Sequence, residues 1–162
     1  MKKENTLKPK TVDESRTEQV QILTQSTLNG TKRLFGGQLM QWIDIVAAVV
    51  ARRHSGCNIT TAVVDTLQFI NPAYGNDMVV LEGYMTYTGR TSMEVCVKTY
   101  VESLDGKRHE INTAYIEMVA LDENENPTQV PPLLITTEEE KEEWNAAVKR
   151  NDLRKLRRKE RF

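Results

Sequence analysis

The middle of the chain alternates between apolar and polar positions. Residues 93, 95, 97, 99 and 101 are Met, Val, Val, Thr and Val, whereas the four residues between them are Glu, Cys, Lys and Tyr. A period of two places the apolar row on one face of a β-strand. Segments rich in Val, Ile, Thr and Tyr predict four long strands, over residues 60–70, 78–87, 92–103 and 108–121. The segments that separate them are short and rich in turn residues, which predicts that consecutive strands are antiparallel.

A helical pattern precedes these strands. Residues 38–54 are predicted to form a helix that ends at Gly56, because glycine readily takes the left-handed conformation of a helix C-cap. We interpret His54, in the last turn, as a cation that stabilises the helix dipole. Residues 20–25 predict an earlier edge strand. Thr136, with Glu139 three residues later, predicts the N-cap of a C-terminal helix.

The order of these elements predicts a single α+β domain. Residues 1–18 are polar and without periodicity, and we expect them to form a flexible arm. Residues 19–135 would form the domain, and residues 136–162 a charged C-terminal helix. Strands and helices do not alternate along the chain, which argues against a doubly wound nucleotide-binding fold.

Composition and charge exclude several classes of function. The chain has 22 Lys and Arg against 23 Asp and Glu, so no overall field attracts nucleic acid. Its two histidines and two cysteines lack metal-ligand spacing, and we expect no metal site and free thiols in a cytoplasmic protein. The longest apolar run, residues 45–51, is far shorter than the roughly 18 residues of a membrane span, so we expect no stable membrane association.

One acidic residue interrupts the predicted helix. Eleven of the thirteen residues from 39 to 51 are apolar and they cover every face, which predicts a helix buried on all sides. Asp44 and Gln41 are the exceptions. Two interpretations of Asp44 are open. In the first, Asp44 has a structural role: it lies at the one solvated position of the helix or accepts structural hydrogen bonds. In the second, it is a general base in an apolar site that raises its pKa.

The entrance of the same helix carries a glycine pair. Gly36 and Gly37 would leave backbone N–H groups open to a ligand, so that they could bind an anion or polarise a carbonyl. The alternative is an ordinary tight turn into a helix. Gly37 and Asp44 are seven residues apart, about 10 Å along the axis. If both act on one carbonyl group, Asp44 must come from a second copy of the chain, at a dimer interface.

Three ordered motifs resemble those of a known enzyme family. They are Asn29-x5-Phe35-Gly36-Gly37-x2-Met40-x3-Asp44, residues 69–77 (FINPAYGND) and residues 88–93 (TGRTSM). On these motifs the chain is similar, over about residues 18–135, to the hotdog-fold acyl-CoA thioesterases of the cytosolic acyl-CoA hydrolase type. The sequence departs from the family at Lys32, which stands where family members usually have a glycine.

The resemblance implies a long central helix wrapped by an antiparallel sheet, with a C-terminal helix after it. It also implies hydrolysis of an acyl-CoA thioester to a fatty acid and free coenzyme A, which is part of the substrate, without a separate cofactor. Asp44 would activate water, Asn29 would hold the thioester or the water, and Gly37 would polarise the thioester carbonyl. Residues that would bind substrate or coenzyme A are Gly36, Gly89, Arg90, Thr91 and Ser92. The family further implies a homodimer or a homohexamer, a trimer of dimers.

Other functions remain as alternatives. A hotdog protein could bind acyl-CoA as a sensor without hydrolysing it. The C-terminal segment is acidic over residues 138–143 (net −4) and basic over residues 149–162 (net +6), an order that suits the dipole of a solvated helix. The basic end could instead contact RNA, a membrane surface, or coenzyme A on a neighbouring subunit.

Overall fold

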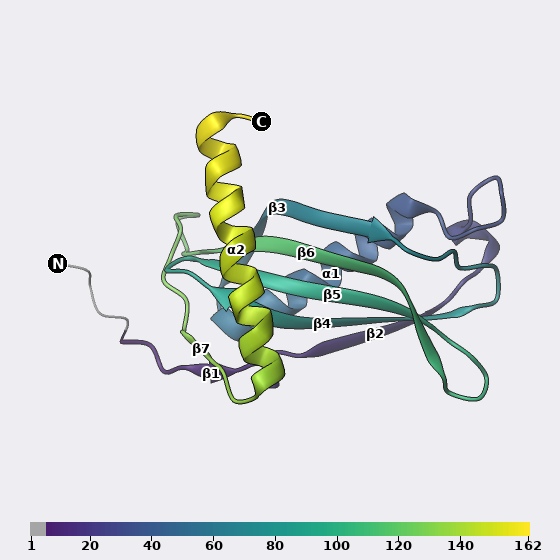
Figure 1. The fold of residues 1–162 in the computed structure, drawn as a ribbon, viewed down its shortest axis with the longest axis horizontal. Coiled ribbons are helices and arrows are strands. Elements are labelled where there is room, and N and C mark those ends of the chain that lie inside the picture. The colour runs from purple at the N-terminus through teal and green to yellow at the C-terminus, as the bar shows by residue number, and fades with distance from the viewer. Residues whose placement is uncertain (1–5) are drawn as a thin grey trace.

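The computed structural model describes residues 6–162, which form a five-stranded antiparallel sheet with a helix on each face (Figure 1). The elements are β1 (Lys10–Thr11), β2 (Thr17–Ile22), a 3-10 turn (Gln25–Thr27), α1 (Gly36–Ser55), β3 (Asn58–Phe69), β4 (Met78–Thr88), β5 (Ser92–Glu102), β6 (Arg108–Leu121), β7 (Leu133–Leu134) and α2 (Glu138–Glu160). The strand order of the sheet is β2-β4-β5-β6-β3, so that β2 and β3 are its two edges. A separate parallel pair joins β1 to β7.

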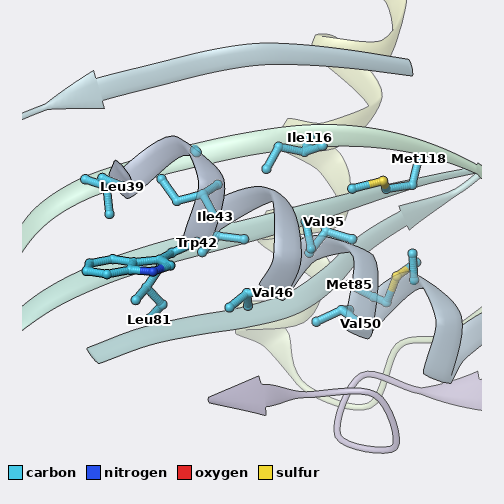
Figure 2. Close-up of a cluster of buried hydrophobic side chains, with 14 of the residues drawn as sticks. Leu39, Trp42, Ile43, Val46, Val50, Leu81, Met85, Val95, Ile116 and Met118 are labelled. Atoms are coloured by element: carbon cyan, nitrogen blue, oxygen red, sulfur yellow. The ribbon is translucent and has the colours of Figure 1, made fainter. Parts of the chain in front are cut away.

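The core lies between α1 and the inner face of the sheet (Figure 2). Ile43, Val46 and Val50 of α1 are at most 1% exposed. The helix approaches β4 closely, since a Cβ on Gly83 would lie 2.6 Å from Val46 Cγ1. The predicted α+β hotdog architecture, an antiparallel sheet packed on a long central helix with a C-terminal helix after it, is therefore confirmed.

The prediction that α1 is buried on all sides is wrong for the single chain. Met40 and Ile45 are each 46% exposed, and Gln41 and Asp44 beside them are exposed too. The sheet covers only one side of the helix, so an apolar stripe faces outward. An apolar surface of this kind marks a contact with another molecule.

The C-terminal helix is not a solvated appendage. α2 packs across the outer face of the sheet (Figure 1). Its residues Ala147, Asn151 and Arg154 are buried. Its N-cap is Thr137, one residue later than predicted, whose side chain accepts a hydrogen bond from the Glu140 N–H. None of the helices described is both long and apolar enough to cross a membrane.

The N-terminal segment is more structured than a flexible arm. Residues 1–5 of the predicted arm lie outside the described residues. After them, β1 pairs with β7, Val12 is 1% exposed, and β2 begins at Thr17 rather than at residue 20.

His54 is a buried neutral side chain rather than a capping cation. The side chain is 0% exposed, and its Nε2 lies 2.8 Å from the carbonyl oxygen of Pro131, to which a neutral ring can donate. Burial lowers the pKa of His54, and the hydrogen bond to Pro131 only partly offsets this effect. The C-cap itself is Gly56, with φ 68° as predicted.

This burial makes a pH-dependent contribution to stability. Because the pKa of His54 is lower in the folded chain, the unfolded chain binds the extra proton first, at about pH 6.5. Stability from this source is complete above that pH and declines as the pH falls below it. We expect the Tm of His54→Gln to depend less on pH than that of the parent between pH 7.5 and 5.5. His109→Gln, at an exposed position, is the control, and parallel curves for all three proteins would contradict the assignment.

Candidate active site

Asp44 lies where α1 meets the edge strand β3. The hydroxyl of Thr61 on β3 donates a hydrogen bond of 2.7 Å to Asp44 Oδ1. Thr61 also lies 3.5 Å from the sulfur of Met118 on β6. Sequence reasoning missed Thr61, because an unremarkable threonine in a strand is linked to Asp44 only by the topology.

The surroundings of Asp44 are apolar although the carboxylate is exposed in the single chain. Met40 and Ile45 flank it on α1, and Val64 on β3 is 45% exposed. A solvated surface carboxylate would not need an apolar border. The carboxylate is therefore accompanied by exposed apolar side chains on both α1 and β3.

The loop before α1 holds Asn29 in a fixed orientation. Its Oδ1 accepts hydrogen bonds from the N–H of Thr31 (3.0 Å), the hydroxyl of Thr31 (2.7 Å) and the N–H of Arg33 (3.2 Å). The side-chain amide N–H groups remain as donors for a ligand. Lys32 has φ 61°, a left-handed conformation that glycine adopts at lower cost. This explains why a glycine suits that position and shows that the loop closes without one.

The entrance of α1 is an open group of backbone donors. The N-cap residue, Phe35, provides no side-chain hydrogen bond to this helix end. A Cβ on Gly37 would lie 2.6 Å from Cε1 of the Phe35 ring, and one on Gly36 would lie 3.3 Å from the Phe69 ring. The two glycines thus allow aromatic rings to lie against the helix entrance. Beside it, Asn29, Arg33, Leu39 and Phe69 line a cavity of about 290 Å³.

The single chain brings the predicted residues together in two separate groups. Asn29 is near the entrance of α1 at Gly36 and Gly37, whereas Asp44 is held by Thr61 further along the helix. Gly37 and Asp44 lie on one side of α1, about 10 Å apart along its axis. One small reacting group cannot contact both within the same chain.

The predicted coenzyme A turn lies apart from both groups. Gly89–Ser92 connects β4 to β5, closed by a hydrogen bond from the Gly89 N–H to the Ser92 carbonyl (2.8 Å). The carbonyl oxygens of Arg90 and Thr91 accept hydrogen bonds from the backbone of Val130 and Ala120. A Cβ on Gly89 would lie 2.7 Å from the hydroxyl of Ser92, so a larger residue there would require the Ser92 side chain to move. The Arg90 side chain is exposed.

The chain resembles proteins of one enzyme family. The model of the thioesterase superfamily matches residues 31–105. The chain is 42% identical over 132 residues to the uncharacterized acyl-CoA thioester hydrolase YkhA of Bacillus subtilis, which covers 81% of this chain and 77% of that protein. It is 33% identical over 141 residues to the cytosolic acyl coenzyme A thioester hydrolase of Rattus norvegicus, covering 84% of this chain but only 36% of that protein.

Solved structures agree with the sequence comparison. An acyl-CoA hydrolase from Bacillus cereus superposes with a TM-score of 0.89 at 39% identity, covering 94% of each chain. The acyl-CoA hydrolase from Staphylococcus aureus, determined in complex with butyryl coenzyme A and coenzyme A, has a TM-score of 0.89 at 31% identity, covering 93% of each chain. With the sheet, the central helix and these similarities together, the chain belongs to the thioesterase superfamily and is a hotdog-fold thioesterase of the acyl-CoA thioester hydrolase type.

Proposed function

We propose that this protein hydrolyses acyl-CoA thioesters at a site shared by two copies of the chain, with Asp44 as the general base. The observation that carries the proposal is the Asp44 carboxylate, held at 2.7 Å by Thr61 within an exposed apolar surface. The hydrogen bond from Thr61 occupies Oδ1, which leaves Oδ2 to accept a proton.

A two-fold axis would complete the site. If it crosses α1 near Met40 and Gln41, two antiparallel copies of the helix place Asp44 of one chain beside Gly37 of the other. The same contact would cover Phe35, Met40, Ile45, Val64 and Phe69, which are 45–56% exposed in the single chain. Burial of such a contiguous apolar surface favours association. The hexameric acyl-CoA thioesterase that matches this chain at 36% identity supports an oligomer.

The chemistry follows from these positions. The thioester carbonyl accepts a hydrogen bond from the Gly37 N–H, and Asn29 donates its side-chain amide to the thioester or to the water. Asp44 removes a proton from the water as the water oxygen attacks the carbonyl carbon. The tetrahedral intermediate then expels coenzyme A as the carbon–sulfur bond breaks, and the coenzyme A thiolate takes up the proton held by Asp44. The products are a carboxylic acid and free coenzyme A.

Residue types altered in the Staphylococcus aureus hydrolase support these roles. Structures of that enzyme have been determined with single alanine replacements of an aspartate, an asparagine and a threonine. In this chain, Asp44, Asn29 and Thr61 are the residues of those three types at the proposed site. Arg90 is the candidate for contact with a phosphate group of coenzyme A, since a guanidinium binds phosphate with two hydrogen bonds.

The substrate class is tested with a series of acyl-CoA thioesters from acetyl to palmitoyl, with released thiol as the readout. We expect turnover of at least one member of the series. Binding of acyl-CoA without turnover of any member would favour the sensor function instead.

The shared site is tested by mixing subunits. If each site needs both Asp44 and Asn29, we expect Asp44→Ala and Asn29→Ala to have little or no activity on their own. When the two variants assemble at random, half of the dimers contain both, and each such dimer has one intact site. We expect about one quarter of the parent activity from the mixture. Activity no higher than that of the separate variants would place Asp44 and Asn29 of the same chain in one site.

A further inference from the structure

Three carboxylates form a row on the outer face of the sheet, under α2. Asp65 of β3, Glu117 of β6 and Glu94 of β5 have side chains that are 5%, 9% and 0% exposed. Glu94 is directly opposite Glu117 in the register of β5 and β6. Like charges opposite one another destabilise a sheet, so this row needs cations above it.

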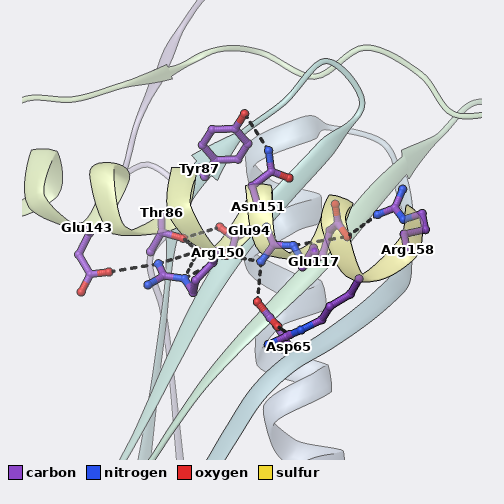
Figure 3. Close-up of polar contacts among 11 residues, drawn as sticks. Asp65, Thr86, Tyr87, Glu94, Glu117, Glu143, Arg150, Asn151 and Arg158 are labelled. Carbon is purple, nitrogen blue, oxygen red and sulfur yellow. Dashed lines mark hydrogen bonds and ion pairs between the residues drawn. The ribbon is translucent and has the colours of Figure 1, made fainter. Parts of the chain in front are cut away.

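α2 supplies those cations as arginines (Figure 3). Arg154 lies 2.6 Å from Glu94 and 3.0 Å from Asp65, and its Nε lies 3.8 Å from Glu117. Arg150 donates to Glu94 at 2.8 Å, and Arg157 donates to Asp65 at 2.8 Å. The arginines on the buried side of α2 therefore form ion pairs with carboxylates of the sheet and are not free to bind nucleic acid.

Asp65 differs from the other two carboxylates because it lies at a β-bulge. The pairing of β3 with β6 shifts register between Thr61 and Val63, and again between Val64 and Thr66. Asp65 is the residue that the second shift leaves without a partner on β6. A bulge bends its strand and redirects side chains, and here it directs the Asp65 carboxylate toward α2.

The bulged segment begins at Thr61, the residue that holds Asp44. Among the strands of residues 6–162, β6 is the only sheet neighbour of the edge strand β3, so within the single chain the irregular stretch has ladder bonds on one side alone. Arg154 and Arg157 fix it from the outer face at Asp65, and the Thr61 hydroxyl contacts Asp44 on the inner face. The same short segment thus connects the α2 ion pairs to the proposed catalytic carboxylate.

We propose that Asp65, held by Arg154 and Arg157, is a positioning residue that sets the place of Thr61 and through it the orientation of Asp44. The proposal rests on the proposed function, since it assumes that Asp44 is the base. It assigns to α2 a role in turnover, although α2 lies on the face of the sheet opposite to Asp44.

The first test compares Asp65→Asn, Arg157→Gln and Arg158→Gln. Arg157 is 48% exposed and Arg158 69% exposed, and Arg158 faces Glu117 of β6 at 3.7 Å instead of β3. We expect Asp65→Asn and Arg157→Gln to lower kcat about fivefold with KM unchanged, because a misoriented base affects the chemical step rather than binding. Arg158→Gln, which removes the same charge from the same helix end, is expected to leave kcat at the parent value. Arg157→Lys, which keeps a cation near Asp65, is expected to restore most of the loss.

The decisive test is a double-mutant cycle with Thr61→Val. If Asp65 acts through Thr61, Asp65→Asn causes no further loss of kcat once Thr61 is replaced. A purely structural effect of Asp65 would multiply with that of Thr61. Multiplicative losses of kcat in this cycle would overturn the proposal. A parent-like kcat for Asp65→Asn would also overturn it. So would dissociation of the oligomer, detected by size-exclusion chromatography, if it accounts for the loss of activity. These outcomes leave the proposed function intact, because that function depends on turnover by the parent and its loss in Asp44→Ala.

Discussion

Replacement of Asp44 by alanine is expected to lower kcat for acyl-CoA hydrolysis by about a thousandfold, the typical contribution of a general base. Binding of acyl-CoA should change little, because the proposed role of Asp44 is to contact the attacking water and not the coenzyme A portion. Thiol release measures kcat, and titration calorimetry with an acyl-CoA that the variant no longer hydrolyses measures its Kd.

Asp44→Asn is the matched variant for this prediction. Asparagine keeps the shape of aspartate and can still accept the hydrogen bond from Thr61, but it cannot take a proton from water. We expect Asp44→Asn to be as inactive as Asp44→Ala. Activity close to that of the parent would mean that Asp44 is a structural hydrogen-bond acceptor, which is the other interpretation that the sequence leaves open.

Arg154→Met is expected to lower the free energy of unfolding by about 3–5 kcal/mol, the range found when one partner of a buried ion pair is removed. Arg154 is 3% exposed and lies among three carboxylates that are at most 9% exposed. Without its charge, Asp65, Glu94 and Glu117 repel one another in a region with little water. Methionine keeps the length and apolar volume of the side chain, so the loss would reflect charge rather than a cavity.

Lys155→Met provides the control for this measurement, because Lys155 is the exposed next residue of the same helix. Denaturant unfolding of all proteins should be compared at one protein concentration, since association of subunits adds to apparent stability. We expect Lys155→Met to change the free energy of unfolding by less than about 0.5 kcal/mol. A similarly small change for Arg154→Met would show that Arg150 and Arg157 suffice to neutralise the row.

Much of the fold follows from local patterns. The alternation in β5 and the β-branched content of β3, β4 and β6 predicted these strands to within two residues at each end, because a strand with one face on the core must repeat every second residue. Gly56 predicted the end of α1, since its φ of 68° is disfavoured for other residues. The N-terminal segment was less predictable, because the pairing of β1 with β7 joins residues more than 120 positions apart.

Several parts of the candidate site were not accessible from local patterns. Asp44 and the glycine pair stand out because they depart from the pattern of a buried helix. Thr61 has no such signal, since its importance arises only when β3 lies along α1. The sequence of the charged tail predicts a solvated helix, because its order of acidic and basic residues suits the helix dipole whether or not the sheet lies beneath it.

Local patterns in the sequence predict the number and type of the main elements and the antiparallel order of consecutive strands, and they single out Asp44 and Gly37 as candidates for chemistry. These features depend on period, turn chemistry and residue type, which act over a few neighbouring positions. The role of Asn29 follows only from the resemblance to the acyl-CoA thioesterases. Three features follow only from the folded chain: Thr61 holds Asp44, Asp65 at a bulge contacts Arg154 and Arg157, and α1 leaves an apolar face uncovered. Hydrogen bonds, ion pairs and exposed surfaces depend on distances between residues far apart along the chain, and those distances are set only when the sheet forms.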